Sequence, residues 1–172
     1  ERACYLPPLV VKPKALTDNR SSGYLTVKGD SLILGGGHNH HNDPISLDVL
    51  NLMNGYELCL HEYILNNVEE EHTHDLDVLE DNPEKQLSEI EKQRAITQQK
   101  KNWARHLEQS AYFYNHILIN NNKMYITNKF DKRGRVYTQG HHINPQGTSY
   151  KKAIVDLYNK EVGEVPLNYC GE

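Results

Sequence analysis

Three cations, one acid and two aromatic residues lie within the eight residues from Phe130 to Tyr137. Two of the cations are the arginines Arg133 and Arg135, and a planar guanidinium group can bind two phosphate oxygens at once. Gly134 between them lacks a Cβ, so the backbone there can approach a ligand closely or adopt a positive φ. These residue types, with Lys132 beside them, predict a contact with nucleic-acid phosphates.

Asp131 can hold one of the two guanidinium groups in a fixed rotamer while the other faces outward. Val136 and Tyr137 favour a strand, so the cluster is expected where a loop enters a sheet. The alternative is a surface network of Asp–Arg ion pairs at the start of a strand, without any ligand. The eight residues are compatible with both interpretations.

Two further groups of basic residues could also contact nucleic-acid phosphates. Lys100, Lys101 and Arg105 fall in a segment with helical periodicity, and the last two share a face because they are four residues apart, with Trp103 off that face. Such a face can follow a phosphate backbone, or it can be an ordinary solvated helix surface. A pair of lysines, Lys151 and Lys152, forms the third basic point.

Charge is distributed unevenly along the 172 residues, whose formal net charge is −4. Residues 57–91 contain twelve acids and one base, whereas residues 92–160 contain thirteen bases and three acids. Binding follows the local potential more than the net charge, so the basic second half remains a candidate for nucleic-acid contact despite the acidic total.

Histidines raise the question of a metal site, because the chain has ten. The dense groups are His38 to His41 and His72 to His74, both in links rich in Gly or Glu. His61-Glu62 begins like a zincin helix, but Leu65 stands where the second histidine would be. Zinc needs three or four convergent ligands on a rigid frame, so no metal site is predicted in this chain.

A complete active site is not predicted either. No Gly-x-Ser-x-Gly motif is present and no cysteine lies in an activating context. The acids of the second half do not fall in apolar strands, as two-metal phosphoryl transfer would require; they are Glu108, Asp131, Asp156, Glu161, Glu164 and Glu172. Cys4, Cys59 and Cys170 share no short spacing and are expected to be free thiols.

The elements that would position these residues are predicted from periodicity and from turn residues. Prolines exclude a helix over residues 5–13, and a hairpin is expected from Gly23–Val27 and Ser31–Leu34. A helix capped by Ser46 is expected to run to about Val68, and a second from about Glu84 to Ile117. The second has a thin apolar stripe, so it should project from the body in an antiparallel hairpin with the first.

The remaining third of the chain is expected to begin with a strand at Met124–Thr127 and to contain a short helix from Tyr150 to about Leu157. Mean hydropathy is −0.75, with one Trp, two Phe and eleven Tyr. This composition indicates a modest core, or one that is completed against a partner. No apolar run is long enough for a membrane span, and no signal peptide is expected.

The motifs resemble those of a known enzyme family. Asp131–Tyr137 followed by Asn144-Pro145-Gln146-Gly147 resembles the T/DxxGR motif and the downstream NPQG of the single-subunit RNA polymerases of phages and mitochondria. The segment Leu6–Lys14 resembles the proline-rich end of that family's N-terminal domain. The two expected helices, over residues 46–68 and 84–117, are similar to its thumb helices.

The resemblance implies a role for each basic residue. Arg133 and Arg135 would hold nucleic-acid backbone, Asp131 would orient them and Gly134 would permit the approach. The other residues that would contact nucleic acid are Lys132, Tyr137, Lys151, Lys152, Lys100, Lys101 and Arg105. The family uses this motif beside the RNA–DNA hybrid and the template.

The sequence departs from the family in that it ends before the palm acids that bind two metal ions. The chain is therefore expected to be either a fragment or one subunit of a polymerase that is split between two polypeptides. The family includes a heterodimeric phage polymerase whose small subunit bears T/DxxGR, and the chain most resembles that subunit. The resemblance therefore implies a large partner subunit with the palm and fingers motifs, Mg2+ bound by that partner, and a DNA template with an RNA–DNA hybrid. A single-stranded-DNA-binding or promoter-loading factor is a further expected partner, and the expected location is the cytoplasm of an infected bacterium.

The expected fold class is α+β, mostly helical, in three segments. Residues 1–43 would be a remnant of the N-terminal domain, residues 44–119 a thumb-like helical hairpin, and residues 120–172 the first strands of a polymerase palm completed by a partner chain. Two other interpretations stay open: a stand-alone, non-catalytic nucleic-acid-binding module and a structural phage protein.

Overall fold

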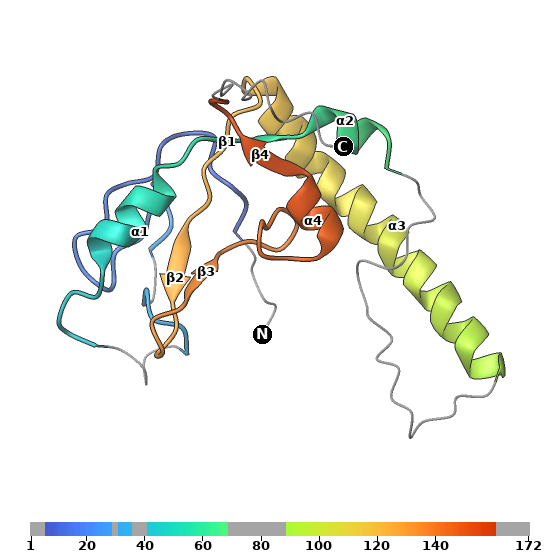
Figure 1. The fold of residues 1–172 in the computed structure, drawn as a ribbon, viewed down its shortest axis with the longest axis horizontal. Coiled ribbons are helices and arrows are strands. Elements are labelled where there is room, and N and C mark those ends of the chain that lie inside the picture. Colours follow the sequence, from blue (N-terminus) through green and yellow to red (C-terminus); the bar gives the residue numbers. More distant parts are fainter. Residues whose placement is uncertain (1–5, 29–30, 36–40, 69–88, 161–172) are drawn as a thin grey trace, which may run out of the picture.

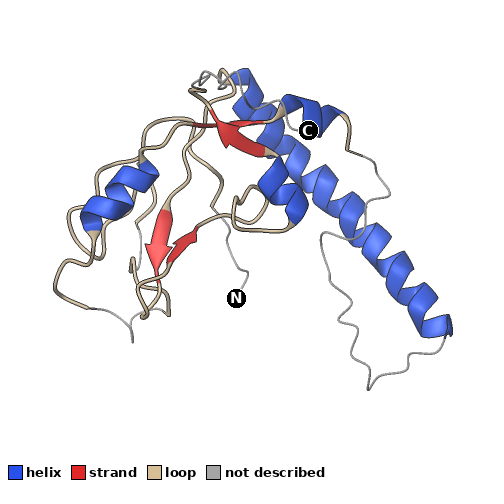
Figure 2. Ribbon diagram, in the orientation of Figure 1, coloured by secondary structure: helices blue, strands red, loops and turns tan. Residues whose placement is uncertain are grey.

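The computed structural model describes residues 6–28, 31–35, 41–68 and 89–160 of the 172. In this part of the chain, two separate two-stranded antiparallel sheets combine with one long and three short helices, an α+β arrangement (Figures 1 and 2). Figure 1 shows an arch: helix α3 (Glu89–Ile119) forms one limb, and strands β2 (Asn128–Phe130) and β3 (Val136–Thr138) lie in the other.

The crown of the arch is the pairing of β1 (Leu58–Leu60) with β4 (Val155–Leu157). Most of the buried core lies beneath this pair, where the C-terminal half of α3 meets the short helix α4 (Ser149–Ala153). The buried side chains of this core are Leu60, Trp103, Tyr114, Ile117, Met124, Ile126, Ile143, Tyr150 and Ile154.

A second, smaller core supports the β2–β3 hairpin. Its buried members are Leu16, Leu32, Leu50 and Phe130, contributed by the N-terminal segment, by α1 (Leu47–Asn54) and by β2. Here two side-chain amides form hydrogen bonds to the backbone, as a neighbouring strand would. The Asn51 amide bonds both backbone groups of Leu16, at 2.7 and 3.0 Å, and the Asn54 Oδ1 accepts from the backbone of Asn128 at 2.9 Å.

The helix expected from Ser46 to Val68 is wrong as a single element. The segment folds as α1, strand β1 and the short helix α2 (Glu62–Asn66). Gly55 is the C-cap of α1, and Leu58 and Leu60 are spaced by two residues, which is the period of a strand. The thumb-like hairpin of two long helices is therefore absent from the described residues, which contain one long helix.

Helix α3 confirms the prediction of a long, projecting helix. Its last two-thirds are anchored through one buried face, formed by Gln99, Trp103, His106, Ser110, Tyr114 and Ile117. Ile90 and Ile96, which the expected stripe included, are exposed at 65% and 46%. The residues before Gln99 are largely exposed, so this end of the helix extends away from the body (Figure 1).

Three other expectations are corrected. Residues 23–27 and 31–34 do not form a hairpin; the second segment lies beside β2 instead, where Leu34 and Phe130 are joined by a 2.6 Å backbone bond. The helix expected to reach Leu157 ends at Ala153, because the β-branched Ile154 and Val155 lead into β4. The strand expected at Met124–Thr127 contributes only isolated bridges, from Met124 and Tyr125.

Long-range pairs cross all the segment boundaries expected from the sequence. Leu9 exchanges two backbone hydrogen bonds with Tyr125, and β1 pairs with β4 almost one hundred residues later. The described residues contain no helix that is both long and apolar enough to cross a lipid bilayer.

Candidate nucleic-acid interface

The arginine motif is the loop of the β2–β3 hairpin, as its strand-forming flank predicts. Phe130 pairs with Val136, and the five residues between them form the loop. The loop is closed by two backbone bonds: Asp131 donates to Arg135 O at 2.9 Å, and Gly134 donates to Asp131 O at 3.0 Å. Lys132 to Arg135 are exposed, so this hairpin presents its cations to solvent.

Asp131 organises the loop from within. Its Oδ1 accepts hydrogen bonds from the backbone N–H groups of Arg133 and Arg135, at 2.8 and 2.9 Å. Its Oδ2 accepts from Nε of Arg133 at 3.0 Å and forms an ion pair with the same guanidinium group at 3.0 Å. The backbone bond from Arg135 is the main reason that the pKa of Asp131 is lowered, and the Arg133 side chain acts in the same direction.

The two arginines therefore differ, as the sequence predicted. Arg133 is fixed by Asp131 although its side chain is 66% exposed. The guanidinium group of Arg135 is exposed and forms no ion pair with any described residue. One arginine is thus pre-organised, and the other can make a full set of hydrogen bonds to a ligand.

Gly134 has φ +78°, in the left-handed region that favours glycine. A Cβ built on it would meet no atom within 4 Å. The glycine is therefore required by the shape of the turn and not by packing within this chain, and the open space leaves room for a ligand to approach the backbone.

The second motif, Asn144 to Gly147, is joined to the first in space. The Gln146 side chain accepts from Thr138 N at 2.7 Å and donates to Val136 O at 3.0 Å, so its amide acts as one more rung along the edge of β3. Asn144 shapes the turn by accepting from Gln146 N at 2.8 Å and donating to Gly140 O at 3.1 Å. The two motifs thus form one unit.

The remaining predicted contact residues lie apart from the hairpin. Lys100, Lys101 and Arg105 are exposed on α3, and Trp103 is fully buried on the opposite side, as predicted. In Figure 1, α3 and the hairpin form different limbs of the arch. The structure therefore presents two separate basic surfaces.

Tyr137 and Lys151 are less exposed than the cations of the hairpin, whereas Lys152 is exposed. The Tyr137 hydroxyl donates to Asp131 at 3.3 Å, so it supports the loop from the strand. Lys152 is exposed, whereas Lys151 is only 9% exposed, and burial lowers the pKa of its ammonium group. Of the two lysines, Lys152 is the one placed to reach a ligand in solution.

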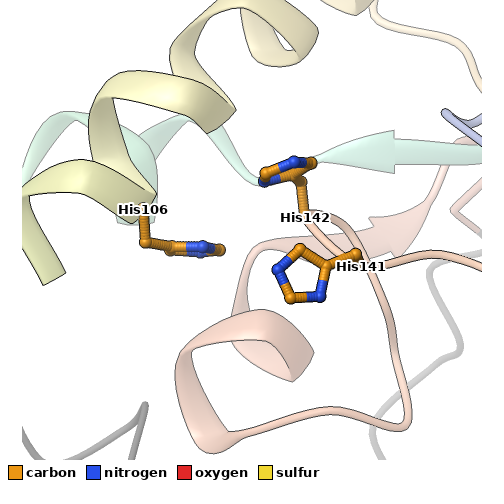
Figure 3. A group of neighbouring side chains, drawn as sticks. All are labelled: His106, His141 and His142. Carbon is orange, nitrogen blue, oxygen red and sulfur yellow. The ribbon is translucent and has the colours of Figure 1, made fainter. Parts of the chain in front are cut away.

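A group of three histidines comes together where sequence analysis predicted no site. His106 from α3 lies beside His141 and His142 from the loop after β3 (Figure 3), and one ring nitrogen from each histidine lies within 4.8 Å of the other two. Burial lowers the pKa of His106 to about 4 and lowers the pKa of the other two; Lys151 acts in the same direction on all three. One feature of the sequence could have indicated this group: the polar residues His106 and Ser110 lie on the same face of α3 as the apolar Trp103.

Among the described residues, these histidines are the only group of potential metal ligands that converge. Three of the described carboxylates form ion pairs: Glu57 with Lys123, Asp131 with Arg133, and Asp156 with Lys160. The paired acids that would hold Mg2+ were expected on a partner chain, and that expectation stays a prediction.

No known protein-family profile and no curated protein sequence matches the chain.

Proposed function

We propose that this chain is a subunit of a DNA-directed RNA polymerase that grips nucleic acid beside an active site whose metal-binding acids belong to a second chain. The observation that carries the proposal is the β2–β3 hairpin, with Arg133 held by Asp131 and Arg135 free to bind. A pre-organised cation next to an adaptable one suits a backbone of regularly spaced phosphates.

The link between the two motifs supports the same proposal. Gln146 fastens the turn of residues 144–147 to the edge of β3, so the hairpin is braced on one side. A braced hairpin positions its arginines with little loss of entropy on binding, which is what a group that aligns a substrate for chemistry requires. Helix α3 would supply the second contact, along the hybrid, through Lys101 and Arg105.

The need for a partner is supported by the small sheets. A two-stranded sheet is marginal by itself, and β4 pairs with β1 alone in the described residues. Next to this pair, Tyr56 and Leu157 are 51% and 54% exposed and line the same open cavity. A large subunit that adds strands to β4 and covers these side chains would complete the core.

The first experiment is purification of the untagged protein from its native source. The proposal expects a large second chain with paired metal-binding acids to co-purify at equal stoichiometry. The complex should extend an RNA primer annealed to DNA in the presence of Mg2+. A protein that purifies without a second chain and still binds RNA–DNA hybrid tightly would instead be a stand-alone nucleic-acid-binding module.

The decisive variant is Arg135→Ala in that complex. Loss of a bidentate, charge-assisted contact should reduce primer extension by at least about tenfold. Primer extension by Arg135→Lys should lie between that of Arg135→Ala and that of the wild type, because a lysine keeps the charge but not the planar guanidinium group. Lys14→Ala, which removes an exposed cation that lies outside the cavity assigned to the large subunit, is the matched control. Unchanged extension by Arg135→Ala would overturn the proposal, and binding without any salt dependence would favour a structural protein.

A further inference from the structure

We propose that His106, His141 and His142 bind one divalent transition metal ion of the zinc class, which fastens the loop between β3 and α4 to helix α3. This proposal does not depend on the polymerase proposal. The three rings come from segments 35 residues apart, and one ring nitrogen from each already lies within 4.8 Å of the other two (Figure 3).

The distances suit zinc after a small movement. A Zn–N bond of about 2.1 Å in a tetrahedral site places ligand nitrogens about 3.4 Å apart. A shift of the exposed His141 ring would close the remaining gap, while His106 is 6% exposed and stacks on Trp103. Solvent would occupy the fourth position, on the exposed side of His141.

The surroundings hold two of the rings in place. The Ser110 hydroxyl lies 3.1 Å from Nδ1 of His142 and can accept a hydrogen bond from it. In that tautomer, Nε2 of His142 is the ligand atom. Metal-binding histidines commonly have such a partner on the second ring nitrogen. Phe113 stacks on His142 at 4.8 Å between ring centroids, and Trp103 stacks on His106 at 5.8 Å.

Lys151 is the charged group that faces the three rings, and it distinguishes a cation site from an anion site. An anion would need the rings as proton donors, but a neutral imidazole has only one N–H. Nδ1 of His142 lies 3.1 Å from the Ser110 hydroxyl, which can use that N–H. The positive charge of Lys151 repels a cation and attracts an anion. Removal of the lysine charge should therefore strengthen metal binding, whereas it would abolish binding of a phosphate.

The test uses the untagged full-length chain, titrated with Zn2+ and, separately, with Co2+ and with inorganic phosphate. The wild type should bind one Zn2+ with a rise in Tm and should give the visible Co2+ spectrum of a tetrahedral site. His141→Ala should weaken binding by at least about 100-fold, and Ser110→Ala by about tenfold or more. Lys151→Met should bind Zn2+ more tightly than the wild type.

The matched control is His116→Ala, which removes an exposed histidine from the last turn of the same helix and should leave binding unchanged. His141→Gln serves as the second variant if His141→Ala loses the wild-type circular dichroism spectrum. Zn2+ binding that survives both His141 variants but is lost in His72→Asn/His74→Asn would overturn the proposal. So would absence of Zn2+ binding by the wild type, or a Tm rise with phosphate alone that Lys151→Met removes.

Discussion

Asp131 shapes its loop with one carboxylate oxygen and orients an arginine with the other. The Oδ1 bonds to two backbone N–H groups would survive in an asparagine, whereas the Oδ2 contacts with Arg133 need the second acceptor. The same residue therefore serves the turn and the binding surface. Gly134 completes the turn through its positive φ, and the cost of replacing it depends on strain alone.

Gly134→Ala should lower the free energy of unfolding by about 1 kcal/mol, because a Cβ is disfavoured at φ +78° but meets no neighbour. Gly140→Ala is the matched comparison. The φ of Gly140 is +149°, and the new Cβ would lie 2.6 Å from the backbone oxygen of Ile143. Gly140→Ala should therefore lower the free energy of unfolding by more than about 2 kcal/mol. Urea unfolding of both variants measures the difference; equal losses would mean that Gly134 is also packed.

At the scale of elements, side-chain amides join segments that short strands cannot hold alone. Asn51 bonds the backbone of Leu16, Asn122 bonds that of Leu60, and Gln146 bonds that of β3. Each strand in the described part has three residues, so each such bond is a large share of the contacts that fix its position. The hairpin depends on Gln146 in particular, because β3 has no other strand on that edge in the described residues.

Gln146→Ala should cost about 1 kcal/mol and release the outer edge of β3, because it removes two hydrogen bonds to the strand. Amide hydrogen exchange of Thr138 should accelerate, since its N–H loses its acceptor. Gln146→Glu is the matched variant: it keeps the acceptor for Thr138 N and loses the donor to Val136 O, so exchange at Thr138 should stay slow. Unchanged exchange in Gln146→Ala would show that the hairpin is rigid without its brace.

At the scale of the whole molecule, the arch separates two basic surfaces by the width of the body. The hairpin lies in one limb, and Lys100, Lys101 and Arg105 lie on the other (Figure 1). The buried face of α3, centred on Trp103, fixes the direction of that limb. A ligand that contacts both surfaces must be long and charged along its length, which is true of a nucleic-acid duplex.

Lys101→Ala/Arg105→Ala should weaken binding of an RNA–DNA hybrid and flatten its salt dependence. Each phosphate contact contributes about 0.7 to 0.9 to the slope of log K against log salt, so the double variant should lose about 1.5. The charge-preserving variant Lys101→Arg/Arg105→Lys should keep the wild-type slope. Fluorescence anisotropy over a range of salt concentrations measures both. A slope that the double alanine variant leaves intact would confine binding to the hairpin.

Local chemistry made the arginine loop predictable. Asp131, Arg133 and Arg135 interact within four residues of one another, so residue types and spacing predicted one paired and one outward-facing arginine. The positive φ of Gly134 was one of the two roles that its missing Cβ allowed. Helix α3 was predictable for a related reason, because helical periodicity repeats within one segment. The buried position of Trp103, opposite the cations, followed from that period.

Contacts between distant segments decided the features that could not be predicted from the sequence. Strand β1 forms within a stretch that has apolar residues at helical spacing because β4, almost one hundred residues away, supplies its hydrogen bonds. The three histidines meet only because α3 packs against the loop after β3, and Gln146 reaches β3 only through a turn. The sequence by itself thus determined the arginine loop and the long helix, whose interactions are local. Tertiary structure alone decided the strands, the brace and the histidine group, because the free energy that forms them comes from partners remote in the chain.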